Sequence, residues 1–178
     1  MPKARGFTLV ELMITVAVLA VVAAIAFPNF KGSIQRNQLA TAANEVLAAV
    51  ALARTEALRS PRAVSLCASD DGASCGGEWS NGWLVWIDED AAGGACDVGS
   101  GDRVLRYVET NRNLSISAES ESGGSADCFQ FDRQGRVQDR GRRALTITVD
   151  DAPDDASLVR EIRISATGQT RICQGACA

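Results

Sequence analysis

The feature that most constrains this chain is a long apolar segment close to its N-terminus. The segment from Phe7 to Phe27 reads FTLVELMITVAVLAVVAAIAF, and Glu11 is its only charged residue. About 20 residues with a rise of 1.5 Å each match the roughly 30 Å hydrocarbon core of a bilayer. The segment therefore predicts a helix that spans a membrane.

The residues in front of this segment argue against an ordinary secretory signal. Such a signal has an apolar region of about 7–15 residues that precedes a small-residue cleavage site. Here a short basic stretch ends in Gly6, directly before the apolar run. A carboxylate in a membrane helix costs on the order of 2.5–3.5 kcal/mol at the bilayer centre, and less near an end. We therefore expect Glu11 to have a partner.

The segment from Arg5 to Glu11, Arg-Gly-Phe-Thr-Leu-Val-Glu, resembles the class III signal of type IV pilins and pseudopilins. The resemblance implies a leader peptide at residues 1–6, which a prepilin peptidase removes by cutting between Gly6 and Phe7. It also implies methylation of the new amino group of Phe7. By the same resemblance, Glu11 pairs with the N-terminus of a neighbouring subunit as a filament grows.

A second, amphipathic helical segment follows the apolar one. Pro28 removes a helix hydrogen bond, so we expect a kink there and the end of the membrane-spanning part, residues 7–30. Residues 31–60 are expected to continue as a helix that packs on a sheet and stops at Ser60-Pro61. Its apolar positions recur at helical spacing: Leu39, Ala43, Val46, Leu47, Val50, Ala53 and Leu58.

The rest of the chain, residues 61–178, has the pattern of a β-rich head. Turn-rich stretches separate short runs in which apolar and polar residues alternate, as in half-buried antiparallel strands. These runs are Ala63 to Cys67, Trp83 to Ile87, Arg103 to Val108, Leu114 to Ser117, Leu145 to Val149 and Val159 to Ser165. We therefore expect an α+β, type IV pilin-like fold, in which one long N-terminal helix packs on an antiparallel sheet.

Six cysteines lie in this head. They are Cys67, Cys75, Cys96, Cys128, Cys173 and Cys177. None forms a Cys-x-x-Cys pair, and the chain has no histidine, so the pattern favours disulfides in an oxidising compartment over a metal site. The sequence leaves the pairing open, although we expect Cys67 and Cys75 to close one local loop.

The composition gives no support for catalysis or a cofactor. Without histidine the chain lacks the usual acid/base group at neutral pH, and no nucleophile has a recognisable base partner. The formal charge of −4 argues against a general polyanion binder. We expect no enzyme activity, cofactor, metal or small-molecule substrate.

Part of the head resembles a narrower family. Asn81 to Asp88, Asn-Gly-Trp-Leu-Val-Trp-Ile-Asp, together with Glu-Ala-Leu-Arg at Glu56 to Arg59, is similar to the GspH/FimT family of minor pilins and pseudopilins. In the same segment, solvated loop charges explain the carboxylates better than calcium binding does. These are Asp88, Glu89, Asp90, Asp97 and Asp102. The tryptophans Trp79, Trp83 and Trp86 are expected in the core rather than as stacking platforms for bases.

Arginines near the C-terminus are candidates for binding DNA phosphates. They are Arg133, Arg136, Arg140, Arg142, Arg143, Arg163 and Arg171. Gly168-Gln169-Thr170-Arg171 resembles the Gly-Arg-x-Arg tail associated with DNA uptake by some of these pilins, but Gln169 stands where that tail has an arginine. Cys173 and Cys177 could brace this tail. A polar hairpin, or a contact with an acidic neighbouring subunit, is the alternative for the other arginines.

The resemblance implies a minor pilin of a type IV pilus that primes assembly or forms part of the tip. A DNA-binding minor pilin and a minor pseudopilin of type II secretion are the alternatives. The implied partners are other minor and major pilins, the prepilin peptidase/methyltransferase, the inner-membrane assembly platform and, in the second case, DNA. The implied location is the inner membrane, with a single span and a periplasmic head, and then the pilus at the cell surface.

Overall fold

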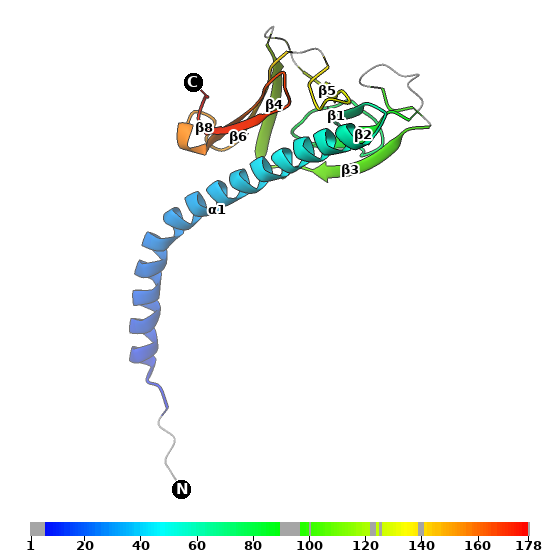
Figure 1. Cartoon of the computed structure of the whole chain (residues 1–178). Coiled ribbons are helices and arrows are strands. Elements are labelled where there is room, and N and C mark those ends of the chain that lie inside the picture. Colours follow the sequence, from blue (N-terminus) through cyan, green and yellow to red (C-terminus); the bar gives the residue numbers. More distant parts are fainter. Residues whose placement is uncertain are drawn as a thin grey trace. The chain divides into compact units, whose positions relative to one another are not determined.

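The computed structural model describes residues 6–89, 97–99, 101–121, 124, 126–138 and 141–177, with the side chains of Pro28 and Asn29 outside the description. The chain divides into two compact units, Met1–Asn37 and Gln38–Ala178. A single helix, α1 (Leu9–Arg59), contributes to both units (Figure 1). Each unit is described by itself.

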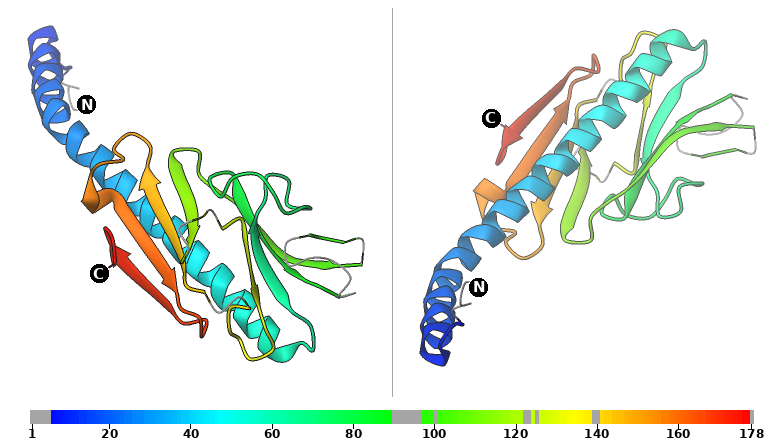
Figure 2. Two further views of the ribbon diagram at one scale, coloured as in Figure 1. Left: turned by 90° about the horizontal axis from the view of Figure 1, so that it is seen from above. Right: turned by 90° about the horizontal axis from the view of Figure 1, so that it is seen from below.

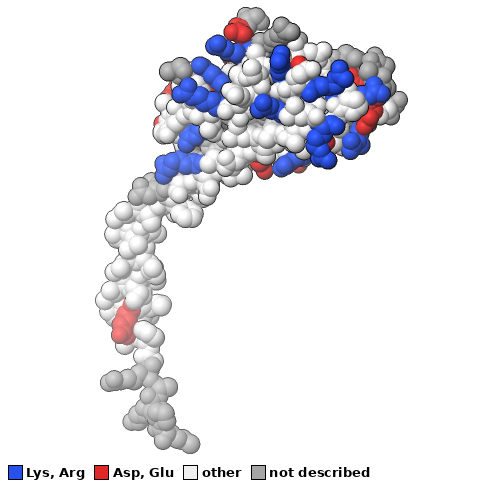
Figure 3. All heavy atoms as spheres, in the orientation of Figure 1, with Lys and Arg blue, Asp and Glu red and all other residues white. Residues whose placement is uncertain are grey.

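The first unit consists mainly of the apolar half of α1. Every side chain from Phe7 to Phe27 is exposed, and this surface is uncharged apart from one acidic patch (Figure 3). The helix is long and apolar enough to cross a membrane. Pro28 lies within the helix, and the expected kink there remains a prediction.

The head contains two four-stranded antiparallel sheets (Figure 1). Sheet A has the order β3-β2-β1-β5, with β1 (Val64–Ala68), β2 (Gly82–Ile87), β3 (Arg103–Glu109) and β5 (Cys128–Phe131). Sheet B has the order β4-β6-β7-β8, with β4 (Leu114–Ser120), β6 (Arg143–Val149), β7 (Val159–Ile164) and β8 (Thr170–Gln174). A short 3₁₀ helix, η1 (Ala156–Leu158), precedes β7.

One face of α1 covers both sheets in the head (Figure 2). From residue 38 onward its buried side chains follow a helical period and are mostly small. They are Leu39, Ala42, Ala43, Val46, Ala49, Val50, Ala53 and Ala57. The expected amphipathic packing is therefore confirmed with one correction. Leu58 is 55% exposed, and Ala57, four residues after Ala53, takes the buried position.

Two sheets, instead of the single sheet expected, lie along the helix for a geometric reason. The 22 residues from Gln38 to Arg59 rise about 33 Å, whereas four strands spaced at about 4.8 Å are only about 14 Å wide. The expected strand regions correspond to β1, β2, β3, β4, β6 and β7. The sequence pattern did not predict β5, an edge strand of sheet A, or β8, an edge strand of sheet B.

The head contains disulfides that involve strands of both sheets. Cys67 bonds to Cys75, as expected, and Cys173 bonds to Cys177. Cys128 is also disulfide-bonded, and Cys96 lies outside the described residues. Among the described cysteines none is free.

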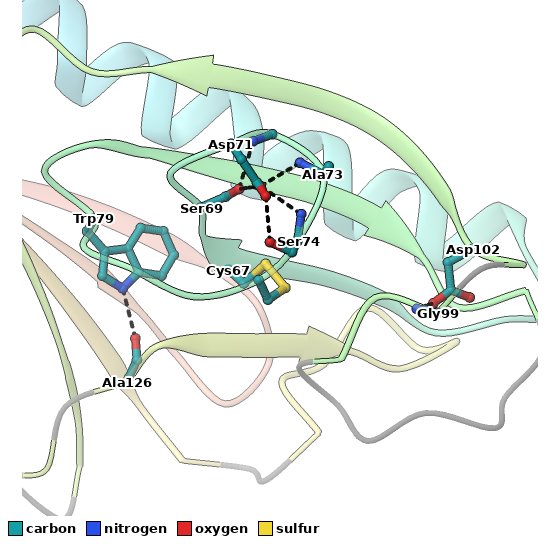
Figure 4. Close-up of a disulfide and its surroundings, with 11 residues drawn as sticks. Cys67, Ser69, Asp71, Ala73, Ser74, Trp79, Gly99, Asp102 and Ala126 are labelled. Atoms are coloured by element: carbon teal, nitrogen blue, oxygen red, sulfur yellow. Dashed lines mark hydrogen bonds between the residues drawn. A yellow bond between two sulfur atoms is a disulfide. The ribbon is translucent and has the colours of Figure 1, made fainter.

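The three tryptophans are buried, so the expectation that they serve packing is confirmed. The Trp79 ring stacks on Phe129 with 5.3 Å between ring centroids. Its Nε1–H donates to the carbonyl of Ala126 at 3.0 Å (Figure 4). In contrast, Nε1 of Trp83 and Nε1 of Trp86 are buried without a hydrogen-bond partner in the described part of the chain.

This difference predicts unequal costs for the same substitution. Trp79→Phe should destabilise the head by about 1–3 kcal/mol more than Trp83→Phe, because only the first leaves a buried acceptor without its donor. Both variants lose the same volume, so each is the other's control. Equilibrium denaturation of the full chain in detergent, followed by circular dichroism, measures the difference, and equal losses would contradict it.

Candidate functional site

Glu11 forms a reciprocal cap with Thr8 at the start of α1. The Thr8 backbone N–H and the Thr8 hydroxyl both donate to Oε2 of Glu11, at 3.1 and 3.0 Å. In return, the Glu11 backbone N–H donates to Oγ1 of Thr8 at 3.2 Å. This is a capping box, with Thr8 at the N-cap and Glu11 three residues into the helix.

The capping box shows how an isolated subunit holds this carboxylate. Both side-chain hydrogen bonds use Oε2, and within the described residues Oε1 accepts none. The side chain is exposed and sits where the positive end of the helix dipole favours an anion. Glu11 is therefore oriented, yet one oxygen remains available to a cation from outside the subunit.

Two of the candidate DNA-binding arginines lie side by side on sheet B. In the register of β7 and β8, Arg163 is directly opposite Arg171, and both are exposed. Nε of Arg163 contacts Oε1 of Glu161 at 2.6 Å, and Oε2 of Glu161 accepts from the Cys177 backbone N–H. Arg163 is therefore already neutralised, whereas Arg171 has no ion-pair partner among the described residues.

The remaining candidate arginines do not form one surface. Arg143 is only 7% exposed, so including it among the phosphate-binding residues was wrong: it begins β6 on the same face as Leu145. Arg142 pairs with Glu121 at 3.9 Å. Arg133 and Arg136 are exposed, and Arg140 lies outside the described residues.

Two turns bring the sheets together close to Arg171. The Val137 backbone N–H donates to the carbonyl of Ala166 at 3.1 Å, which links the turn after β5 to the β7–β8 turn. A Cβ on Gly168 would overlap the carbonyl oxygen of Gly135, and the Arg54 side chain packs against both glycines. The segment identified as a binding tail is thus also a structural contact between the two sheets.

The described acidic residues between β2 and β3 show no metal site. Asp102 accepts a hydrogen bond from the backbone N–H of Glu89 at 2.9 Å. It accepts another from the backbone N–H of Gly99 at 2.7 Å (Figure 4). Asp90 lies outside the described residues. Across the part of the chain that is described, no group of three metal-binding side chains comes together.

Asp71 organises the loop closed by the Cys67–Cys75 disulfide. Its carboxylate accepts from the backbone N–H groups of Ala73 and Ser74, both at 2.8 Å, and from the Ser74 hydroxyl (Figure 4). These hydrogen bonds, led by the one from Ala73, hold the pKa of Asp71 well below its usual value. The Asp71 carboxylate therefore stabilises this loop.

A polar pocket of about 560 Å³ lies between the ends of the two sheets. Its charged lining residues are Asp70, Glu78, Glu109, Asp150 and Arg112. Oδ1 of Asp70 accepts from the Glu78 backbone N–H and from the Asn81 side chain. The residues that line it include no cysteine and no histidine.

The observed features define a class of protein: an exposed apolar helix with a capped carboxylate near its start, joined to a disulfide-bonded head. Matches to family models agree with this class. Residues 42–168 match the family described as Type II transport protein GspH, and residues 1–27 match the prokaryotic N-terminal methylation motif. The chain belongs to the GspH family of type IV minor pilins and pseudopilins.

Curated relatives point to the same class. A fimbrial protein of Pseudomonas aeruginosa is 38% identical over 71 residues, which cover 40% of this chain and 46% of the relative. The type IV major fimbrial protein FimA of Dichelobacter nodosus is 32% identical over 122 residues, covering 64% of this chain and 70% of FimA. The chain thus spans a little under half the length of the first relative.

Solved structures share the fold. The type IV minor pilin FimU of Pseudomonas aeruginosa has a TM-score of 0.56 at 24% identity, covering 78% of this chain and 90% of FimU. The minor pseudopilin EpsH of Vibrio cholerae has a TM-score of 0.57 at 12% identity, covering 80% and 98%. The expected α+β, pilin-like fold is confirmed.

Sequence reasoning missed two residues that organise the sites. Thr8 was visible as the first residue of a Thr-x-x-Glu pattern, which is a capping-box signature. Glu161 was visible two residues before Arg163, a spacing that places both side chains on one face of a strand.

Proposed function

We propose that this protein is a minor pilin that enters a type IV pilus, where it primes assembly or forms part of the tip, and that its role is structural rather than catalytic. The observation that carries the proposal is the exposed, mostly apolar surface of residues 7–27, in which Glu11 is the only charged residue. In water such a surface is unfavourable, so it needs lipid and then the helices of other subunits.

The proposed route begins with insertion of residues 7–30 in the inner membrane, with residues 61–178 in the periplasm. The match to the methylation motif over residues 1–27 supports removal of residues 1–6 by cleavage between Gly6 and Phe7, and methylation of Phe7. The processing enzyme, the inner-membrane assembly platform and other minor and major pilins are the proposed partners. Glu11 would meet the new N-terminus of a neighbouring subunit.

Deletion of the gene, with two readouts, tests this proposal against a role as a type II secretion pseudopilin. We expect the deletion strain to lose sheared surface pili while its secreted enzymes remain in the culture supernatant. A tagged copy of the chain should restore the pili and be found in them. Loss of secretion with normal pili would favour the pseudopilin function instead.

A second candidate function, DNA binding for uptake, is favoured by one observation. Arg171 is exposed, has no ion-pair partner among the described residues, and lies directly opposite Arg163. The Arg163 charge is already paired with Glu161, so Arg171 is the cation of this pair that an anion would neutralise. A phosphate backbone supplies such an anion.

Arg171→Ala should weaken any DNA binding by the full chain and reduce the slope of log affinity against log salt by about 0.9, because one phosphate contact is lost. Arg112→Ala is the matched control, since it removes one arginine from the acidic pocket. Fluorescence anisotropy with labelled duplex DNA at two salt concentrations measures both. Equal effects of the two substitutions, or no binding at low salt, would reject this function.

A further inference from the structure

Three cysteines from separate segments share one small cluster on sheet A. Cys67 in β1, Cys128 in β5 and Cys75 in the loop after β1 pack with Leu84 and Trp86. This cluster is distinct from the main core beneath α1. Cys67 is bonded to Cys75, while Cys128 is held in another disulfide. Sulfur atoms of two disulfides therefore belong to the same cluster.

The strand register gives Cys67 a second partner within reach. Cys67 and Cys128 are directly opposite each other in the antiparallel pairing of β1 and β5. The next residue, Ala68, donates its backbone N–H to the carbonyl of Asp127. Hydrogen-bonded and non-hydrogen-bonded pairs alternate in such a ladder, so Cys67 and Cys128 form a non-hydrogen-bonded pair.

Side chains come closest at this kind of pair. Its Cα atoms are about 4.5 Å apart, inside the roughly 4.4–6.8 Å range that a disulfide spans. A bond between Cys67 and Cys128 would join two strands that are already paired. It therefore needs no movement of the backbone of sheet A.

We propose that Cys67, Cys75 and Cys128 form a disulfide-exchange site, in which Cys67 can bond either to Cys75 or across the sheet to Cys128. The outside reactant is a thiol, such as the dithiol of a periplasmic thiol–disulfide oxidoreductase. Its thiolate attacks the sulfur of Cys75, which is partly exposed, whereas Cys67 is fully buried. The Cys67–Cys75 bond breaks, Cys75 forms a mixed disulfide with the reactant, and Cys67 leaves as a thiolate.

The released thiolate completes the exchange. Cys67 attacks the sulfur of Cys128, the bond across the strands forms, and the former partner of Cys128 leaves as a thiolate that takes up a proton. One disulfide is consumed and one is formed, so this step needs no oxidant. The exchange moves a covalent constraint from the Asp71 loop to the β1–β5 pair.

Cys75→Ser tests the proposal without an added thiol, because Cys67 then starts as a free thiol beside Cys128. The full chain is exported, purified in detergent, alkylated without reduction and cut after arginine and glutamate. These cuts separate residues 63–78, which contain Cys67, from residues 122–133, which contain Cys128. We expect mass spectrometry to find the two fragments joined in most molecules, with one cysteine outside this pair newly alkylated.

Cys177→Ser is the matched control, because it frees Cys173 in sheet B. We expect Cys173 to be alkylated there and the fragments 63–78 and 122–133 to stay separate. Alkylated Cys67 in the Cys75→Ser chain, with Cys128 in its original bond, would overturn the proposal. Bonds from Cys67 to Cys173 or Cys177 would overturn it too, since they show that the register does not direct the exchange.

The wild-type chain provides a measurement that does not depend on a variant folding. After incubation in a glutathione redox buffer and rapid alkylation, fragment 63–78 should appear joined to fragment 122–133, with glutathione on Cys75. Reduction of Cys67–Cys75 to two alkylated cysteines, without any joined fragments, would count against the exchange site.

Discussion

Replacing Glu11 with alanine is expected to remove the protein from sheared pili while leaving its amount in the membrane unchanged. The proposed partner of Glu11 is the N-terminal ammonium group of a neighbouring subunit, in surroundings that apolar side chains dominate. Leaving one member of a buried ion pair uncompensated costs on the order of 3–5 kcal/mol. We therefore expect the variant to fall about a hundredfold or more in the pilus fraction, measured by quantitative immunoblotting.

A control is needed because Glu11 also caps its own helix. Thr8→Ala removes the hydrogen bond that the Thr8 hydroxyl donates to Glu11 and the one that it accepts from the Glu11 backbone N–H, but it keeps the carboxylate. Loss of such a cap costs about 1 kcal/mol, so Thr8→Ala should still enter pili. Equal loss of both variants would assign the effect to the helix cap, and normal incorporation of Glu11→Ala would reject the proposed ion pair.

Local patterns in the sequence were sufficient for most of the architecture. A 3.6-residue period predicted the buried face of α1, and alternation predicted β4 and β6, whose observed burial alternates in the same way. Leu58 misled the prediction because its apolar side chain outweighed its position, whereas Ala57 continues the buried series through Ala53. The helical period was the better guide there than the hydrophobicity of single residues.

The missed strands lack a strong local signal. β5 has only four residues, Cys128–Phe131, and follows a stretch of the sequence rich in glycine, serine and glutamate. β8 is an edge strand with mostly exposed side chains, so Thr170–Gln174 was interpreted as a binding tail. Both strands depend on pairing with distant partners, β1 and β7, which no local pattern contains.

Among the candidate sites too, some features follow from local sequence patterns and others depend on contacts between distant segments. Arg143 is two residues before the apolar Leu145, so strand alternation could have predicted that Arg143 is buried. In contrast, the position of Cys67 directly opposite Cys128 in sheet A depends on the register of two strands that are distant in the sequence. The meeting of the Gly135 and Gly168 turns depends on how two sheets pack along one helix.

This meeting of turns leads to the largest expected effect on stability. Gly168 has φ +75°, a conformation that residues with a side chain rarely adopt. Its missing Cβ leaves room for the carbonyl oxygen of Gly135, which belongs to the backbone and cannot rotate away. Gly168→Ala should therefore combine backbone strain with overlap at a packed contact, and we expect a loss of about 2–4 kcal/mol.

Gly124→Ala is the matched control, because among the described residues its Cβ would meet only the Ser120 hydroxyl, at 3.8 Å. Thermal unfolding of the full chain in detergent, followed by the near-ultraviolet circular dichroism of the buried tryptophans, measures both variants. We expect Gly124→Ala to unfold close to the wild type. If Gly168→Ala also did so, Gly168 would not be a fixed contact between the sheets, and its place in the Gly168-Gln169-Thr170-Arg171 segment would instead need explanation by binding.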